Sequence, residues 1–234
     1  MKKNKIGLLI IATNKYVRFL QSLISSADNF FCKDSKVTYF IFTDKEDLNI
    51  TSSRKIKFIK TEHKEWPFMT LERYKIFNNN KDKLLKMDYL FYCDADMRFE
   101  NYVSEEILEE RVATRHPGFF NSIENIAIEA LEGNSNSLAY ISKEEGSQYF
   151  AGGFNGGTAY EYLKMSNKIG ENIQKDLDNN LIARWHDESH LNRYFIDNPP
   201  TKILDPSYCY PESWNLPFAR KLLALDKDHK EMRS

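Results

Sequence analysis

Short, continuous apolar runs recur along the N-terminal part of the chain and predict β-strands. A strand that is covered on both faces has no exposed side, so few polar residues interrupt it. The clearest runs are Ile6–Ala12, Val37–Thr43 and Tyr89–Cys93, and Arg54–Lys60 is a weaker one. We therefore expect a sheet with helices on both of its faces.

Between and after these runs, apolar positions recur every three or four residues, which is typical of amphipathic helices. Helices are expected over about 15–31, 71–86, 158–177 and 187–196. Thr70 is the expected cap of the second helix, and the polar residues 132–148 predict a loop. Strands that alternate with helices predict an α/β fold with a mostly parallel central sheet flanked by helices.

Length and charge narrow the class of protein. The chain has 234 residues, enough for one large domain, and 33 basic residues balance 34 acidic ones. This balance argues against nucleic acid as a partner, because phosphate backbones favour basic faces.

Three scattered cysteines form no disulfide framework and point to a reducing compartment. No apolar stretch approaches the ~20 residues that cross a bilayer. We expect a soluble, cytoplasmic protein without an integral membrane segment, at most peripheral to the inner membrane face.

Two aspartates directly follow the strand predicted at Tyr89–Cys93. Ligands of open α/β sheets bind at the carboxyl ends of strands, and alternate residues of an extended segment point the same way. Asp94 and Asp96 could therefore aim both carboxylates at one Mg²⁺ or Mn²⁺ ion that bridges to substrate phosphates. The alternatives are a solvated turn and a phosphatase of the haloacid dehalogenase type. The phosphatase motif belongs on the first strand, which carries no acid here.

The densest polar cluster runs from Trp185 to His190. Two histidines four residues apart, His186 and His190, resemble a zinc site, but Asp187 is short for a general base and no third ligand is evident. A second interpretation is a helix N-terminus, where the helix dipole stabilises acidic side chains. A third is a catalytic site, in which Asp187 and Glu188 face a sugar beside the ring of Trp185.

A glycine-rich stretch and a lone histidine are further candidates. Residues 149–157 hold four glycines but match neither a dinucleotide-binding motif nor a P-loop. The stretch is either a tight crossing from strand to helix or a place where the backbone approaches a ligand closely. His116, followed by Pro117-Gly118, is on its own more often structural than functional.

The order of these segments closely resembles the family 6 glycosyltransferases, which include the blood-group A and B transferases, the α-1,3-galactosyltransferase, the Forssman synthase and bacterial members. The matching segments cover nearly the whole chain: Tyr16, Asp94-Ala95-Asp96, His116–Phe119, Tyr149–Gly153, Trp185–Asn192 and Pro200–Leu204. The resemblance implies a retaining transferase with the GT-A fold. Such an enzyme moves galactose or N-acetylgalactosamine (GalNAc) from UDP, in α-1,3 linkage, to a β-galactoside acceptor.

The resemblance also implies roles for single residues by position. The residues expected to bind the UDP-sugar donor are Ala12, Thr13, Tyr16, Arg73, Asp94, Asp96, Ala151, Gly152, Gly153, Asp187, Lys227 and Arg233. Those expected to bind the acceptor are His116, Trp185, Glu188 and Glu212, although the chain departs from the animal enzymes around Glu212. Glu188 matches the candidate catalytic nucleophile. Asp94 and Asp96 match a pair that holds Mn²⁺ or Mg²⁺.

We therefore expect a single GT-A catalytic domain over 1–234. Its nucleotide-binding half covers about 1–97, its acceptor-binding half about 98–225, and a mobile basic tail 226–234. The small residues Ala151-Gly152-Gly153 leave room for an N-acetyl group, which favours UDP-GalNAc as the donor. The expected acceptor is an oligosaccharide or glycolipid β-galactoside, fucosylated, H-antigen-like ones included. The alternatives are a UDP-Gal-dependent enzyme and a sugar-binding relative that has lost catalysis.

Overall fold

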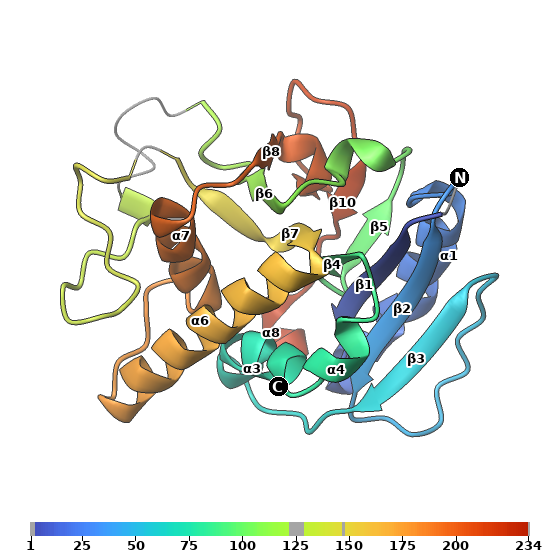
Figure 1. Ribbon diagram of the computed structural model, residues 1–234, viewed down its shortest axis with the longest axis horizontal. Helices are drawn as coiled ribbons and strands as arrows, with labels where there is room; N and C mark the ends of the chain where they lie inside the picture. The colour runs from blue at the N-terminus through green and yellow to red at the C-terminus, as the bar shows by residue number, and fades with distance from the viewer. Residues whose placement is uncertain (1–2, 122–128, 147, 234) are drawn as a thin grey trace.

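A seven-stranded sheet runs through the middle of the molecule in the order β3-β2-β1-β4-β7-β6-β8 (Figure 1). The computed structural model describes residues 3–121, 129–146 and 148–233, without the side chain of Arg233. The strands are β1 Lys5–Ile11, β2 Lys36–Thr43, β3 Lys55–Lys60, β4 Tyr89–Cys93, β6 Arg111–Arg115, β7 Phe150–Thr158 and β8 Lys202–Leu204. The first four strands in the chain are parallel, and β7 runs antiparallel to its neighbours β4 and β6. The predicted α/β class with a mostly parallel sheet is confirmed.

A smaller sheet joins the segment after Asp96 to the C-terminal part of the chain. It consists of β5 Met97–Phe99, β10 Leu222–Ala224 and β9 Tyr210–Pro211. β10 runs antiparallel to β5, and the Leu225 N–H just beyond it donates to the Asp96 carbonyl at 2.9 Å. This pairing holds the start of the C-terminal segment beside the two aspartates that follow β4.

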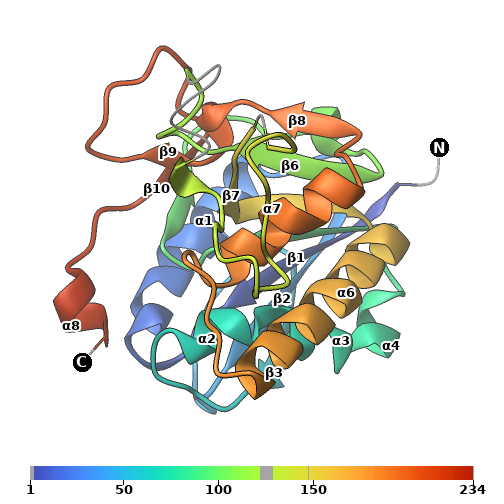
Figure 2. The same ribbon diagram turned by 90° about the vertical axis from the view of Figure 1, so that its left-hand side faces the viewer.

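Helices cover both faces of the large sheet. The 3₁₀ helix η1 (Asn14–Phe19) and α1 (Leu20–Phe30) lie on one face, and α3 (Arg73–Asn78), α6 (Ala159–Asp178) and α7 (Asp187–Asp197) on the other. Figure 2 shows α6 and α7 crossing their face together. Short elements complete the fold: α2 Phe68–Leu71, α4 Lys81–Leu84, η2 Glu105–Ile107, η3 Pro206–Tyr208 and α8 His229–Arg233. Within the described ranges, no helix has both the length and the apolar character needed to cross a bilayer.

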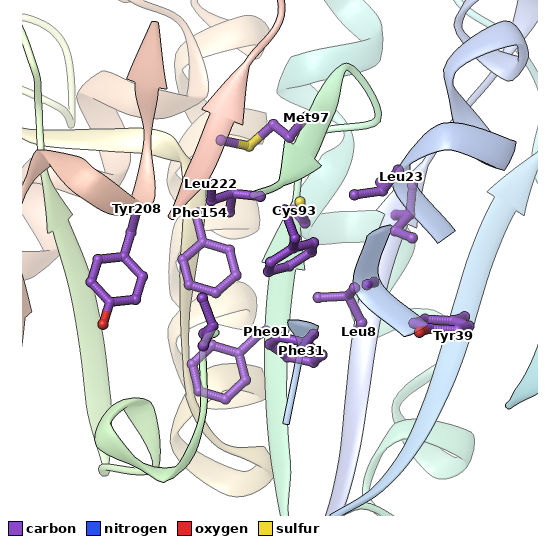
Figure 3. Close-up of a cluster of buried hydrophobic side chains, with 14 of the residues drawn as sticks. Leu8, Leu23, Phe31, Tyr39, Phe91, Cys93, Met97, Phe154, Tyr208 and Leu222 are labelled. Atoms are coloured by element: carbon purple, nitrogen blue, oxygen red, sulfur yellow. The ribbon is translucent and has the colours of Figure 1, made fainter. Parts of the chain in front are cut away.

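The alternation of side chains along β1 explains why both faces are covered. Leu8 joins a cluster with α1, which also contains Phe91 and Phe154 (Figure 3). Leu9 points the other way and joins the cluster beneath α3 and α6. Every residue of β1 between its ends is buried, as the continuous apolar run predicts.

Two predicted helices differ from the structure. The helix expected over 15–31 begins as η1 and becomes α-helical only at Leu20. The helix expected over 71–86 is divided into α2, α3 and α4, and Thr70 lies inside α2 rather than at a cap. The Thr70 hydroxyl donates to the Pro67 carbonyl at 2.8 Å, so the expected cap is wrong. Asn80, which precedes α4, donates to the Ile76 carbonyl, and asparagine side chains of this kind compete with helical hydrogen bonds.

The glycine-rich stretch forms a strand, and not the tight crossing that was one of its interpretations. It makes most of β7, which pairs with β4 from Tyr89↔Thr158 to Cys93↔Phe154. Gly156 is required there, because a Cβ at this position would lie 2.2 Å from Cδ1 of Phe91. The two predicted helices that follow are confirmed as α6 and α7, and the described residues of 132–148 contain neither a helix nor a strand.

Candidate active site

A cavity of about 380 Å³ lies at the carboxyl ends of β1 and β4. This is the edge at which open α/β sheets bind ligands. Its walls come from the turn after β1, from α3, from the turn after β4 and from the C-terminal segment. They include Thr13, Tyr16, Arg73, Asp94, Asp96 and Lys227.

The two aspartates both border this cavity, although the segment that carries them turns at Ala95–Asp96 and is not extended as predicted. The Asp94 N–H donates to the Gly153 carbonyl of β7 at 2.9 Å, which fixes the start of the turn. Asp96 is only 7% exposed, and burial together with the neighbouring Asp94 charge raises the pKa of its carboxyl. The Lys227 ammonium contacts Asp96 directly. The acidic pair is therefore a site that attracts a cation.

Arg73, on α3, lines the cavity. Its guanidinium donates to the Gly152 carbonyl at 2.8 Å and forms an ion pair with Asp187, and both partners of the pair are almost completely buried. The guanidinium carbon also lies 4.1 Å from the centre of the Tyr92 ring. Burial raises the pKa of Asp187 to about 7, and Arg73 opposes that rise. The ion pair thus favours the anionic form of Asp187, whose pKa would lie higher still without Arg73.

Glu188 lies on the other side of Gly152. The Gly152 N–H donates to Glu188 Oε2 at 2.6 Å, so this one residue of β7 contacts both Arg73 and Glu188. Burial raises the pKa of the Glu188 carboxyl, and the Gly152 N–H opposes the rise. Both acids stand at the start of α7, immediately after His186, which has a positive φ of 53°. A positive φ is strained for a histidine, and such strain is characteristic of functional sites.

Among the residues expected around the acceptor, Trp185 is exposed, whereas His116, Glu188 and Glu212 are partly buried. His116 Nδ1 accepts the Gly118 N–H at 3.1 Å, so a neutral His116 carries its proton on Nε2. Burial lowers the pKa of His116 to about 4, which keeps the ring neutral at physiological pH. Its ring packs 4.9 Å from Phe119 and 5.6 Å from Tyr149, between centroids. Trp185 is 49% exposed and is available to stack on a sugar.

Other predicted site residues occupy different places. Ala12 is completely buried in the cluster beside α1, and Ala151 is buried in the same cluster. Glu212 accepts the Asp226 N–H at 3.0 Å, so it holds the chain that leads into the C-terminal segment. A Cβ on Gly153 would lie 3.0 Å from Asp94 Oδ2. The side chain of Arg233 lies outside the described residues.

The zinc alternative finds no support. The His186 ring packs edge-on against Trp66, with 4.9 Å between centroids, whereas His190 Nε2 lies 3.5 Å from Asp176. The two histidines therefore contact different neighbours. Within the ranges that the structure describes, no three side chains of histidine, cysteine, aspartate or glutamate come together as a metal site.

Sequence reasoning missed some residues of this site. His63 lines the cavity, and its Nδ1 lies 2.9 Å from the Thr13 hydroxyl. Trp66 and Tyr92 also line it. His63 stands in the polar segment 61–65, which matches no motif, and Trp66 follows that segment directly. Tyr92 in particular is hidden inside an apolar run that predicts only a strand.

A mostly parallel sheet flanked by helices, with a cavity and an acidic pair at the carboxyl ends of its strands, is consistent with a glycosyltransferase that uses a nucleotide-sugar donor. The family model of glycosyltransferase family 6 matches residues 1–234. The chain belongs to this family, as the resemblance in the sequence implied.

Proteins similar to this chain come from animals and bacteria. Histo-blood group ABO system transferase 1 of Rattus norvegicus is 31% identical over 245 residues, which cover 100% of this chain and 70% of the relative. Globoside alpha-1,3-N-acetylgalactosaminyltransferase 1 of Gallus gallus is 32% identical, covering 98% and 69%, respectively. The O-antigen biosynthesis glycosyltransferase WbnI of Escherichia coli is 27% identical and covers 96% of both chains.

Proposed function

We propose that this glycosyltransferase moves GalNAc from UDP-GalNAc, in α-1,3 linkage and with retention, to a β-galactoside acceptor, fucosylated, H-antigen-like acceptors included. The observation that carries the proposal is the position of Gly152, whose carbonyl contacts Arg73 and whose N–H contacts Glu188. This places the Arg73–Asp187 pair and the Glu188 carboxylate next to the acidic pair at the cavity. The relatives, among them an alpha-1,3-N-acetylgalactosaminyltransferase, support the same donor and linkage.

The residues present fit a divalent cation. Asp94 and Asp96 offer hard oxygen ligands at the cavity, and the Lys227 ammonium already accompanies the buried Asp96 carboxylate. Asp94 and Asp96 would hold the cation at the cavity. When bound, Mn²⁺ or Mg²⁺ supplies a positive charge that stabilises the leaving UDP.

The chain's own residues divide the remaining work. Lys227 can move from Asp96 to the diphosphate and stabilise the charge that develops as the bond from the sugar C1 to the UDP oxygen breaks. Arg73 favours the anionic form of Asp187, and Asp187 can accept hydrogen bonds from donor-sugar hydroxyls. His116 Nε2 can donate to the acceptor galactose, which Trp185 can contact with its exposed ring.

Retention requires either two inversions or a return on the same face. In the first route, the Glu188 carboxylate attacks C1 as UDP leaves, and the acceptor O3 then displaces Glu188. In the second route, Glu188 stabilises the developing positive charge while the acceptor O3 attacks from the side that UDP left. In both routes the O3 proton passes to a phosphate oxygen of the released UDP.

A donor–acceptor matrix tests the function. The purified chain is incubated with UDP-GalNAc or UDP-Gal, Mn²⁺, and either a β-galactoside, a fucosylated β-galactoside or no acceptor. Release of UDP that depends on the acceptor, together with an α-1,3-linked GalNAc product, is the expected result. Binding of UDP without any turnover would favour the sugar-binding relative instead, and release of inorganic phosphate would revive the phosphatase.

Removal of divalent cations should abolish transfer. EDTA treatment should lower the turnover to the background of an Asp96→Asn variant, because the leaving diphosphate loses the charge held at Asp94 and Asp96. Added Mn²⁺ should restore the wild-type enzyme and leave Asp96→Asn inactive. Full activity after exhaustive chelation would refute the role given to the acidic pair.

Deletion of residues 226–234 should raise the KM for the UDP-sugar and lower kcat together. The deletion removes Lys227, His229 and Met232 from the cavity wall, so the diphosphate loses a cation and the site gains water. Lys227→Ala should reproduce much of the effect. Lys230→Ala, which removes an exposed lysine from α8, is the matched control and should behave as wild type. Unchanged kinetics after the deletion would show that the tail is only a solvated charged segment.

The wild-type enzyme should prefer UDP-GalNAc to UDP-Gal in kcat/KM, and Gly152→Ala should shift this ratio toward UDP-Gal by about tenfold. The new Cβ would lie 3.3 Å from Glu188 Oε2 and 3.6 Å from Arg73 Nη2, where it narrows the space for the N-acetyl group. Gly153→Ala is the matched control, because its Cβ meets Asp94 and should slow both donors alike. A wild-type preference for UDP-Gal would overturn the donor assignment and leave the family unchanged.

A further inference from the structure

Tyr92 connects two parts of the site that are otherwise separate. It is the second-last residue of β4, and its side chain is 4% exposed. Its hydroxyl donates to Asp94 Oδ1 at 2.5 Å, and its ring lies under the Arg73 guanidinium, 4.1 Å from the guanidinium carbon. The Tyr92 side chain therefore contacts both Asp94, at the expected cation site, and Arg73, the basic partner of the Arg73–Asp187 ion pair.

The position of Tyr92 follows from the strand. Residues two apart on a strand share a face, so the Tyr92 side chain and the start of the Asp94 turn lie on the same side of the sheet. An ionised carboxylate can only accept hydrogen bonds, so the Tyr92 hydroxyl is the donor in this contact. A donated proton restricts the rotation of the Asp94 carboxylate. It also leaves Oδ2, on the side of Gly153, as the less restrained oxygen.

We propose that Tyr92 is a positioning residue with two contacts: its hydroxyl orients the Asp94 carboxylate toward a divalent cation, and its ring packs against the Arg73 guanidinium. Tyr92 would thereby fix the residues near the diphosphate relative to those near the donor sugar. This inference rests on the proposed function. Partners that orient a ligating side chain by a hydrogen bond typically contribute 10-fold to 100-fold to metal affinity or activity.

Tyr92→Phe separates the two contacts, because it removes the hydroxyl and keeps the ring under Arg73. Isothermal titration of UDP into the protein, in Mn²⁺ and in EDTA, measures the result without turnover. We expect Tyr92→Phe to weaken UDP binding in Mn²⁺ by about tenfold and to leave the weak binding in EDTA unchanged. Addition of more Mn²⁺ should recover part of the affinity, because the defect lies in the cation site.

Tyr39→Phe is the matched control. Tyr39 is also a completely buried tyrosine of the sheet, and its hydroxyl also donates to a carboxylate, Asp28 Oδ1, at 2.8 Å. It lies on β2, beside α1, and does not line the cavity. Both variants lose a buried hydroxyl of the same kind, so a general loss of stability would affect both. Only Tyr92→Phe should change the Mn²⁺-dependent affinity for UDP.

Tyr92→Leu removes the ring as well and should lower kcat further than Tyr92→Phe, because Arg73 loses the surface on which it rests. If Tyr92→Leu does not fold, Tyr92→Phe alone decides. The inference would be overturned if Tyr92→Phe bound UDP in Mn²⁺ within twofold of the wild-type affinity. It would also be overturned if the wild-type protein bound UDP equally well in Mn²⁺ and in EDTA. Neither result would contradict the proposed transfer reaction, which fails only if the matrix of donors and acceptors yields no product.

Discussion

Glu188→Gln should lower the turnover of GalNAc transfer by about 100-fold or more and leave UDP binding nearly intact. The substitution keeps the shape of the side chain and an oxygen that can accept the Gly152 N–H, which now lies 2.6 Å from Glu188 Oε2. It removes the negative charge, which matters most when positive charge develops at C1 in the transition state. Initial rates at saturating donor and acceptor, with UDP affinity from titration, separate the two effects.

The matched control for this variant is Glu171→Gln, which makes the same chemical change on an exposed position of α6 and should be without effect. Turnover near the wild-type value in Glu188→Gln would exclude Glu188 as nucleophile and as ion-pair partner. The catalytic carboxylate would then be sought at Asp187, its neighbour in the first turn of α7.

Arg73→Met should reduce turnover by about 100-fold and also destabilise the protein by about 3 kcal/mol. Arg73 and Asp187 form a buried ion pair, and removal of one partner leaves the other without compensation. Because Arg73 opposes the rise in the Asp187 pKa, its loss should push that pKa further above about 7 and leave the carboxyl protonated at neutral pH. Urea unfolding and steady-state kinetics measure the two consequences on the same preparation.

Lys60→Met is a suitable control for the stability effect, since it breaks the ion pair with Glu46, in which both side chains are highly exposed. Such pairs contribute little in water, so the unfolding transition should stay where it is in the wild type. An Arg73→Met variant that is as stable as Lys60→Met would mean that the Asp187 pocket is reached by water and that its carboxylate does not depend on Arg73.

The apolar pattern predicted the sheet well because its central strands are buried on both faces. Ile6–Ala12 and Tyr89–Cys93 allow hardly any other structure, and both became strands with nearly the predicted ends. The region of α2, α3 and α4 was predicted less well, as one helix instead of three. Its apolar residues do face the core, but the asparagines between α3 and α4 and the Thr70 hydroxyl interrupt the helix locally. The strand formed by the glycine-rich stretch was also missed, because glycine has no side chain that could show the alternation of a strand.

The charged part of the site could be anticipated, whereas its supports could not. Asp94 and Asp96 stand out because they directly follow a buried strand, and Asp187 and Glu188 because they lie in the densest polar cluster of the sequence. Tyr92 and His63 act through contacts with residues that are near in space, at Arg73 and Thr13, and no local pattern marks such contacts. The burial of Ala12 likewise depends on the packing of α1 over β1, which the spacing of apolar residues alone does not specify.

The place of β7 in the sheet has a consequence for how the chain is made. β4 pairs with β7, whose first residue, Phe150, follows the last residue of β4 after a long intervening segment. A growing chain that has formed β1 to β4 therefore presents β4 as an open edge until β7 leaves the ribosome. Bare edges of this kind pair readily with other chains. The acidic turn after β4 would be equally unfinished, because the Asp94 N–H finds its acceptor only on Gly153. The strands of the first 97 residues thus complete their sheet only with a strand that lies much later in the chain.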